Sequence, residues 1–388
     1  MCRSRSRRIV LLAAGQSGRD FAPGLDVRKQ RWTWTALTIV VELFVVAGVV
    51  WRLGYRESGS LGPAPTGTSS IIGVHTRLSD EVEESKIRRT TQMVREMGAA
   101  WMVELFPWAY VEPTKGSFDW GHSDMVVRAA NEQGLTLIAR LDFVPAWARP
   151  KDTTPRYLDS EHFADYAEFV HEFVQRYRGS IRYYAIWNEP NTSFEWGYRP
   201  VDPVEYTRLL KMAYEQVKSA DPDAKVLPAG LAPTIEESTL ALNDLVYLQR
   251  MYDAGARDYF DVMNVHAYGW TLPPDDPPAP DRINFARVAL VREVMVRNGD
   301  AAKPIVITEA GWNDHPRWAK AVRPGQRIEY TIRAYQKAAE EWPWVLALNM
   351  WVFRLPVPAH NYNDYFTFVD TEFRPKPIYE AVKQYASR

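Results

Sequence analysis

Two glutamates each follow a short apolar run of the kind that forms a buried β-strand. Glu189 follows the run 181–187 (IRYYAIW) in the motif Asn-Glu-Pro-Asn, and Glu309 follows the run 304–308 (PIVIT). A carboxylate in such a place is costly to bury unless it has a partner or a task. Two carboxyl groups about 5–5.5 Å apart can cleave a glycosidic bond with retention, one as acid/base and one as nucleophile. We take the pair as candidate catalytic residues; the alternative is a pair of helix N-caps or ion-pair partners.

Eight β-rich runs alternate with longer helical segments after residue 70. The predicted strands are 71–75, 101–105, 136–142, 181–187, 225–229, 260–266, 304–308 and 345–351. The predicted helices are 80–97, 123–133, 160–177, 203–219, 238–254, 282–298, 326–341 and 376–386. Helical spacing of the apolar residues is clearest in 160–177.

Eight such repeats predict an α/β fold, a (β/α)8 TIM barrel. An open doubly wound sheet is the competing arrangement, but it typically has a Gly-rich loop after its first strand, and 73–80 (GVHTRLSD) offers none. In a barrel the loops after the strands carry the chemistry. The ends of strands four and seven meet at the same mouth, so Glu189 and Glu309 can face one cleft.

The segment IWNEPN (186–191), the downstream segment 203–230 and TEAGW (308–312) resemble one clan of enzymes. In these (β/α)8 retaining glycosidases the acid/base follows strand four and the nucleophile ends strand seven. The chain is most similar to glycoside hydrolase family 39 and its bacterial exopolysaccharide-hydrolase relatives, and next to the cellulase-like family 5. The resemblance implies that Glu189 is the acid/base and Glu309 the nucleophile.

The same resemblance implies roles for residues next to the pair. Asn188 would hydrogen-bond the sugar 2-hydroxyl. His266 and Tyr268 alternate onto one face of strand six, and the tyrosine would hold the nucleophile and keep it ionised. Trp351, at the end of strand eight, would stack under the sugar at the cleavage point. Packing is the alternative for His266, Tyr268 and Trp351.

Five further candidates lie at the predicted mouth. Trp108, Trp147 and Trp312 are each either a sugar platform or part of the core. Asp142, at the end of strand three, could bind a hydroxyl or cap a loop. His75, at the end of strand one, could face the nonreducing subsite.

An arginine close to the nucleophile, common in family 5, is hard to place in this sequence. Arg77 and Arg140 are the candidates, and we expect Arg140 to alternate away from the barrel face that the neighbours of Asp142 indicate. This favours family 39 over family 5. The loop 269–281 contains five prolines and would wall one side of the cleft, with Trp270 as a further stacking face; an inert surface loop is the alternative.

Composition excludes several other functions. The net charge is −1 and the body of the chain has no long charged run, which argues against nucleic acid as a partner. The one cysteine, Cys2, allows neither an internal disulfide nor a cysteine metal site. The seven histidines show no HxH or HExxH spacing, and no phosphate-loop motif occurs. We expect no metal and no cofactor.

The N-terminal residues differ in kind from the rest. Residues 1–32 are a basic tail, 33–51 form a 19-residue apolar run and 52–69 a Gly, Ser, Pro and Thr-rich linker to a catalytic domain at 70–388. The run is long enough to span a bilayer, although Glu42 within it costs about 2.5–3.5 kcal/mol if it resembles Asp. The positive-inside rule places the catalytic domain outside the cytoplasm. A cleaved signal peptide and a helix buried in the fold are the alternatives.

We therefore expect a membrane-anchored retaining β-glycosidase that cuts within a poly- or oligosaccharide and acts as a monomer. One alternative is an exo-acting, β-xylosidase-like enzyme. The other is a noncatalytic polysaccharide-binding or secretion scaffold, which would be expected to have lost one of the two carboxylates.

Overall fold

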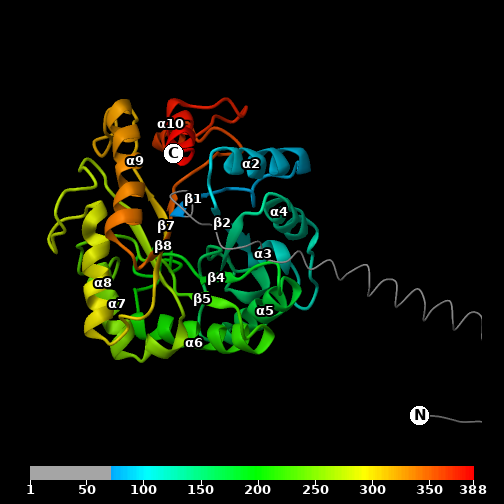
Figure 1. The fold of residues 1–388 in the computed structure, drawn as a ribbon. Helices are drawn as coiled ribbons and strands as arrows, with labels where there is room; N and C mark the ends of the chain where they lie inside the picture. The colour runs from blue at the N-terminus through cyan, green and yellow to red at the C-terminus, as the bar shows by residue number, and fades with distance from the viewer. Residues whose placement is uncertain (1–70) are drawn as a thin grey trace, which may run out of the picture. The chain divides into compact units, whose positions relative to one another are not determined.

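Eight parallel strands form the centre of the fold in the computed structural model, which describes residues 71–388 (Figure 1). They are β1 (Ile72–His75), β2 (Trp101–Pro107), β3 (Thr136–Asp142), β4 (Tyr183–Ile186), β5 (Lys225–Leu227), β6 (Met263–Tyr268), β7 (Ile305–Gly311) and β8 (Val345–Met350). Neighbouring strands pair in the order β5-β4-β3-β2-β1-β8-β7-β6. The N–H of Asp261, just before β6, donates to the carbonyl of Val226 in β5 at 2.9 Å and joins the two ends of the sheet. The predicted TIM barrel is confirmed.

Eight long helices surround the strands (Figure 1). They are α2 (Glu84–Glu96), α4 (Gly121–Glu132), α5 (Phe163–Arg176), α6 (Pro203–Ala220), α7 (Asp244–Asp253), α8 (Val288–Arg297), α9 (Pro324–Glu341) and α10 (Pro377–Ala386). Each coincides with a predicted helix. A one-turn helix, α3 (Trp108–Val111), and several 3₁₀ turns in the loops were not predicted.

Local signals explain where the helices begin and which face they bury. The carboxylate of Asp202 caps α6 by accepting from the backbone N–H groups of Val204 and Glu205, and Pro203 opens the helix. Helix α5 buries the apolar stripe read from the sequence: Phe163, Tyr166, Ala167, Phe169, Val170, Phe173 and Val174.

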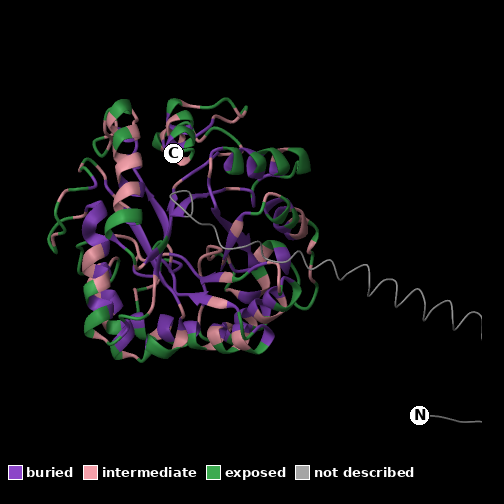
Figure 2. Ribbon diagram, in the orientation of Figure 1, coloured by how far each residue is buried: buried purple, intermediate pink, exposed green. Residues whose placement is uncertain are grey.

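The barrel has two apolar layers, because successive strand residues point to opposite sides. A small inner cluster fills the barrel, comprising Ala100, Trp101, Val103, Ile138, Ala185, Leu227, Val262, Val306 and Ala347. A larger cluster lies between the strands and the helices. In Figure 2 most strand residues are buried, and the helices are exposed on their outer faces.

No helix within residues 71–388 is long and apolar enough to cross a membrane. The predicted basic tail, membrane helix and linker lie outside the described residues, and the anchor stays a prediction.

Candidate active site

A cleft of about 500 Å³ opens where the strands end, within the size range of small-molecule sites. Glu189 and Glu309 both line it, together with Asn188, Tyr268 and Trp351. One oxygen of each glutamate and a ring nitrogen of His266 all lie within 4.8 Å of one another. The fold therefore brings the two predicted catalytic carboxylates together.

Glu309 faces the cleft because β7 contains a bulge. Ile305 and Ile307 pack in the outer core and Val306 in the barrel interior, so strict alternation would turn Glu309 outward as well. Val265 of β6 pairs with Ile307, but the next residue, His266, pairs with Glu309. The extra residue, Thr308, shifts the alternation by one position and turns Glu309 inward.

The backbone also leaves strand geometry after β4. Trp187 has a φ of 74° and Glu189 a φ of 40°, both in the left-handed region that is strained for residues with a side chain. Trp187 turns away to pack on Trp196 and Tyr166. This turn directs Asn188 and Glu189 to the cleft.

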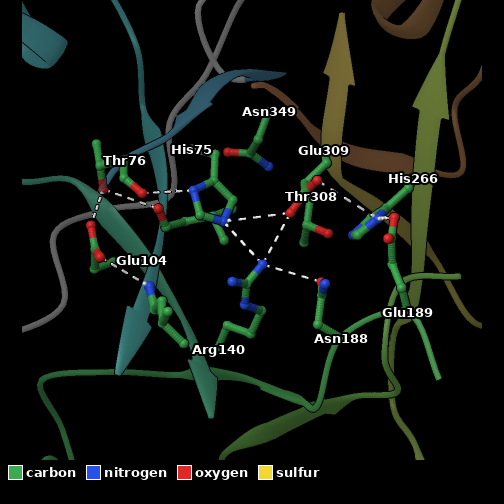
Figure 3. Close-up of polar contacts among 12 residues, drawn as sticks. His75, Thr76, Glu104, Arg140, Asn188, Glu189, His266, Thr308, Glu309 and Asn349 are labelled. Carbon is green, nitrogen blue, oxygen red and sulfur yellow. Dashed lines mark hydrogen bonds and ion pairs between the residues drawn. The ribbon is translucent and has the colours of Figure 1, made fainter. Parts of the chain in front are cut away.

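Both oxygens of Glu309 accept hydrogen bonds, and Figure 3 shows the one from Arg140. Arg140 Nη1 donates to Oε1 at 3.0 Å, and the Tyr268 hydroxyl donates to Oε2 at 2.9 Å. Burial alone would raise the pKa of Glu309, but the positive charges of His266 and Arg140 and the Tyr268 bond outweigh it and hold the pKa below its usual value. Glu309 is thus kept as a carboxylate.

The expectation that Arg140 points away from this face is wrong. Residues 140 and 142 lie two positions apart on β3, so their side chains share a face. Arg140 Nε lies 3.1 Å from Asp142 Oδ2, and Nη1 also donates to Asn188 Oδ1 at 3.1 Å. Arg140 therefore joins β3, β4 and β7 at the mouth and supplies the arginine that the sequence left unplaced.

Asp142 contacts this arginine rather than the cleft. It is buried, does not line the cleft, and burial raises its pKa to about 6 despite the nearby Arg140 charge. Asp142 was predicted to bind a sugar hydroxyl, but in the structure it lies behind Arg140, whose guanidinium separates it from the cleft.

His75 lies beneath the cleft floor. Its side chain is fully buried, packs edge-on against Trp351 at 4.6 Å, and places Nδ1 2.7 Å from the carbonyl oxygen of Thr76. Burial and the charge of Arg140 lower its pKa to about 3, so the ring is neutral and Nδ1 donates to Thr76. His75 was expected to face a sugar subsite, but in the structure it is buried and supports the ring of Trp351.

Glu189 has a more open setting. Its Oε1 lies 2.8 Å from His266 Nδ1, and its side chain is 22% exposed against 9% for that of Glu309. Burial opposes a charge on His266, but Glu309 and Glu189 outweigh it and raise the pKa of the imidazole. His266 therefore lies between the carboxylates, within 3.8 Å of Glu309 Oε2.

Of the five tryptophans predicted as stacking faces, Trp351 and Trp270 line the cleft and three do not. Trp108 stacks on Phe169 in the core. Trp147 packs on Trp108 and donates to the carbonyl of Glu112 at 2.9 Å, and Trp312 donates to the carbonyl of Leu272 at 2.8 Å. Trp108 and Trp312 are buried and Trp147 is half-buried, and all three pack against neighbouring side chains.

Several cleft residues were missed because they lie within long loops after the strand ends. They are Phe143, Arg156, Glu195, Trp318, Lys320, Tyr362, Asn363 and Phe366. Trp270, predicted as a stacking face, lines the cleft and stacks on Tyr268 at 5.4 Å. Trp318 stacks on Tyr362 at 4.5 Å. The signal for Trp318 and Tyr362 was their position in the loops after strands seven and eight.

A third carboxyl group, Glu195, follows Glu189 on the same loop. Arg156 Nε donates to its Oε2 at 2.7 Å. Burial, which outweighs the Arg156 charge, and the nearby Glu189 raise the pKa of Glu195 to about 7. This group therefore changes charge near neutral pH.

Glu189, His266 and Glu309 form a possible three-ligand metal cluster among the described residues. Arg140 and Tyr268, however, already donate to both oxygens of Glu309. A guanidinium 3.0 Å from a ligand oxygen repels a cation. The donor set is thus poorly suited to a metal ion.

Comparisons with known proteins agree with this architecture. Residues 78–162 match the model of glycoside hydrolase family 42, beta-galactosidase. The solved structures similar to this chain include a family 39 glycoside hydrolase from the gut symbiont Bacteroides cellulosilyticus WH2 (TM-score 0.66, 21% identity, 83% of this chain and 65% of that one). The fold is that of a (β/α)8 glycoside hydrolase.

Two further structures extend the comparison. One is a monomeric beta-xylosidase from Caulobacter crescentus CB15 (TM-score 0.60, 18% identity, 82% of this chain and 68% of that one). The other is a GH5_18 protein from Bifidobacterium longum subsp. infantis (TM-score 0.58, 13% identity, 82% and 78%). This chain spans about two thirds of the length of the first two relatives. No curated protein sequence matches it. The predicted resemblance is confirmed, and the similarities support a glycosidase.

Proposed function

We propose that this protein is a retaining β-glycosidase that hydrolyses a poly- or oligosaccharide outside the cytoplasm. The observation that carries the proposal is the approach of one oxygen of Glu189 and one of Glu309 to within 4.8 Å in a single cleft. Retaining enzymes hold their carboxyl groups about 5–5.5 Å apart, whereas inverting enzymes leave about 6.5–9.5 Å for a water molecule. The short separation favours direct attack by one carboxylate.

The surroundings of the two groups assign the roles. Glu309, ionised and fixed through both oxygens, attacks the anomeric carbon and forms a covalent glycosyl-enzyme intermediate. Glu189 donates its proton to the leaving oxygen, and then takes a proton from the water that releases the sugar. Glu189 is more exposed, which suits a group that must exchange protons with water.

Neighbouring residues supply contacts to the sugar. Arg140 occupies the amide oxygen of Asn188, so the Asn188 N–H₂ group remains to donate to a 2-hydroxyl. Trp351 lines the cleft beside the pair and offers a stacking face. Hydrogen bonds to the 2-hydroxyl that strengthen in the transition state contribute several kcal/mol in such enzymes.

Internal cleavage of the glycan is our proposed mode of action. Aromatic rings lie along the cleft on the β6, β7 and β8 loops as well as beside the catalytic pair, in Trp270, Trp318, Tyr362 and Trp351. Several stacking faces suit a chain of several sugars. The similar beta-xylosidase structure supports the exo-acting alternative. Product lengths distinguish the two, since internal cleavage releases mixed oligosaccharides and terminal cleavage releases one sugar.

The test uses the full-length protein beside its Glu309→Gln variant on a panel of β-linked glycans and aryl glycosides. We expect the wild type to cleave at least one member, the variant to be inactive, and proton NMR to show that the first product keeps the β configuration. An initial α product would replace the retaining mechanism with an inverting one. If neither protein cleaves any member but both bind a glycan, the scaffold alternative replaces the enzyme.

We further propose that residues 33–51 anchor the protein with residues 70–388 outside the cytoplasm. The support is the apolar run and the basic residues that precede it. The protein should partition with membranes, and protease added to intact cells or spheroplasts should digest the catalytic domain. Recovery of a shortened, freely released protein would show that the run is a cleaved signal.

A further inference from the structure

Basic side chains outnumber carboxylates on the wall of the cleft. Four basic residues line it, Arg77, Arg140, Arg156 and Lys320, against Glu189, Glu195 and Glu309. Glu189 must carry a proton when the glycosidic bond breaks, which leaves two negative charges at that step. A concave surface with an excess of one charge attracts ligands of the opposite charge.

Arg156 is held rigidly beside the catalytic acid. Its guanidinium lies 4.8 Å from the ring centre of Phe143 and 4.6 Å from that of Phe194, and Nε donates to Glu195 at 2.7 Å. Glu195 follows Glu189 by six positions on the loop after β4. Two aromatic faces and one carboxylate thus fix the plane of the guanidinium.

The terminal nitrogens of Arg156 remain available to a ligand. Within residues 71–388 neither Nη atom makes a hydrogen bond to another residue, and the side chain is 27% exposed in the cleft. A guanidinium presents these two nitrogens as a planar fork that matches a carboxylate or a sulfate. Because the side chain is already fixed, binding such a group costs little further ordering.

Lys320 adds a second positive charge at the cleft edge. Its Nζ lies 4.2 Å from the ring centre of Trp270, and no described residue forms an ion pair with it. Arg77, by contrast, is paired with Asp80. Lys320 therefore attracts an anion at longer range, whereas Arg156 has the geometry to bind one directly.

We propose that the glycan is acidic and that Arg156 pairs with the carboxylate of a uronic acid, or with a sulfate ester, on the Glu189 side of the cleft. This inference takes from the proposed function that the ligand is a glycan, but its own claim is about binding and not about hydrolysis. It can therefore be tested apart from hydrolysis.

The experiment measures binding by calorimetry to the full-length Glu309→Gln variant, which does not consume the ligand. The probes are matched acidic and neutral oligosaccharides: β-mannuronan with mannan, β-glucuronan with cellulose and glucuronoxylan with xylan. A sulfated form of each neutral member separates sulfate from carboxylate recognition. We expect the acidic member of at least one pair to bind about tenfold more tightly or better than its neutral partner.

Arg156→Gln should weaken binding of that acidic member about 10- to 100-fold and change binding of its neutral partner by less than about threefold. Arg176→Gln is the matched control. Arg176 also lies over two aromatic rings, Trp120 and Tyr177, and bonds a carboxylate, Asp124, but it does not line the cleft. Arg156→Lys keeps the charge without the planar fork and should bind with intermediate affinity, and thermal unfolding checks that each variant is folded.

Three results would overturn the inference: no acidic or sulfated probe binds, acidic and neutral members bind equally, or Arg156→Gln weakens both members equally. Hydrolysis by the wild type separates the two proposals. Cleavage of a neutral glycan without any acidic preference removes this inference and leaves the glycosidase. Selective binding of acidic glycans without cleavage removes the glycosidase and leaves the binding site.

Discussion

The ends of β4 and β7 each present a glutamate to one cleft, but they hold it in different ways. Glu309 is anchored through both oxygens by Arg140 and Tyr268, whereas Glu189 has His266 as its one side-chain partner among the described residues and is more exposed. A nucleophile must be charged and fixed before the reaction begins. An acid must lose and regain a proton, so firm anchoring of both oxygens would hinder it. This asymmetry between the two strand ends is what the proposed division of roles rests on.

Removal of each carboxylate gives the largest expected effects and tests this division. Glu309→Gln should lower kcat about 10⁴-fold or more on every substrate, because no covalent intermediate can form. Glu189→Gln should lower kcat/KM about 10²- to 10⁴-fold on glycans but far less on aryl glycosides with an acidic phenol, because kcat/KM reports the first step and such a phenol leaves without a proton. Steady-state kinetics on both substrate types measure this. Similar losses on both types for Glu189→Gln would break the assignment.

Arg140→Gln should affect Glu309, the proposed nucleophile. A charge-assisted hydrogen bond contributes about 1.5–3 kcal/mol, so kcat/KM should fall about 10- to 150-fold. Loss of the positive charge also raises the pKa of Glu309, and activity should therefore disappear at a higher pH on the acid side of the profile. Tyr268→Phe removes a neutral donor from the same carboxylate and should shift the acid limb less. An unchanged acid limb in Arg140→Gln would show that the arginine is structural. Thermal unfolding checks whether the fold is destabilised when Asp142 loses this partner.

Gly230→Ala should affect Glu189, the proposed acid, through its partner His266. A methyl group at Gly230 would lie 2.3 Å from His266 Nε2, so the imidazole must move and its contact with Glu189 is disturbed. We expect kcat/KM on glycans to fall about tenfold, with a smaller change in kcat/KM on substrates whose leaving group needs no proton. Gly325→Ala is the control, because nothing lies within 4 Å of its added methyl group. Equal losses on both substrate types would show that the distortion reaches Glu309.

The smallest expected effect is on the stability of the fold and comes from the third carboxyl group, Glu195. The pKa of Glu195 is about 7 in the folded protein and 4.5 ordinarily, so between these values the folded state binds a proton that the unfolded state has lost. The free energy of unfolding should therefore fall as pH rises from about 5 to 7, by at most about 3 kcal/mol from this group. Glu195→Gln should flatten that fall, as measured by denaturant unfolding at several pH values. Parallel pH curves for the two proteins would contradict the shift.

The sequence by itself determined the barrel and the two strand ends after which Glu189 and Glu309 lie. The period of two in the strands, the period of 3.6 in the helices and cap signals such as Asp202-Pro203 are local properties, so the elements were found where they occur. His266 and Tyr268 lie two positions apart on β6, and alternation placed both side chains on the face that contacts the two glutamates, as predicted.

The tertiary structure decided which residues form the site. Alternation would have turned Glu309 outward but for the extra residue Thr308, and the contacts of Arg140 with Asn188 and Glu309 join segments that are far apart in the sequence. Whether Trp108 or Trp351 meets a sugar depends on which neighbours cover each ring. Bulges, the course of long loops and the burial of a ring by distant segments depend on contacts between residues far apart in the chain. The local spacing of residues in the sequence does not predict such contacts.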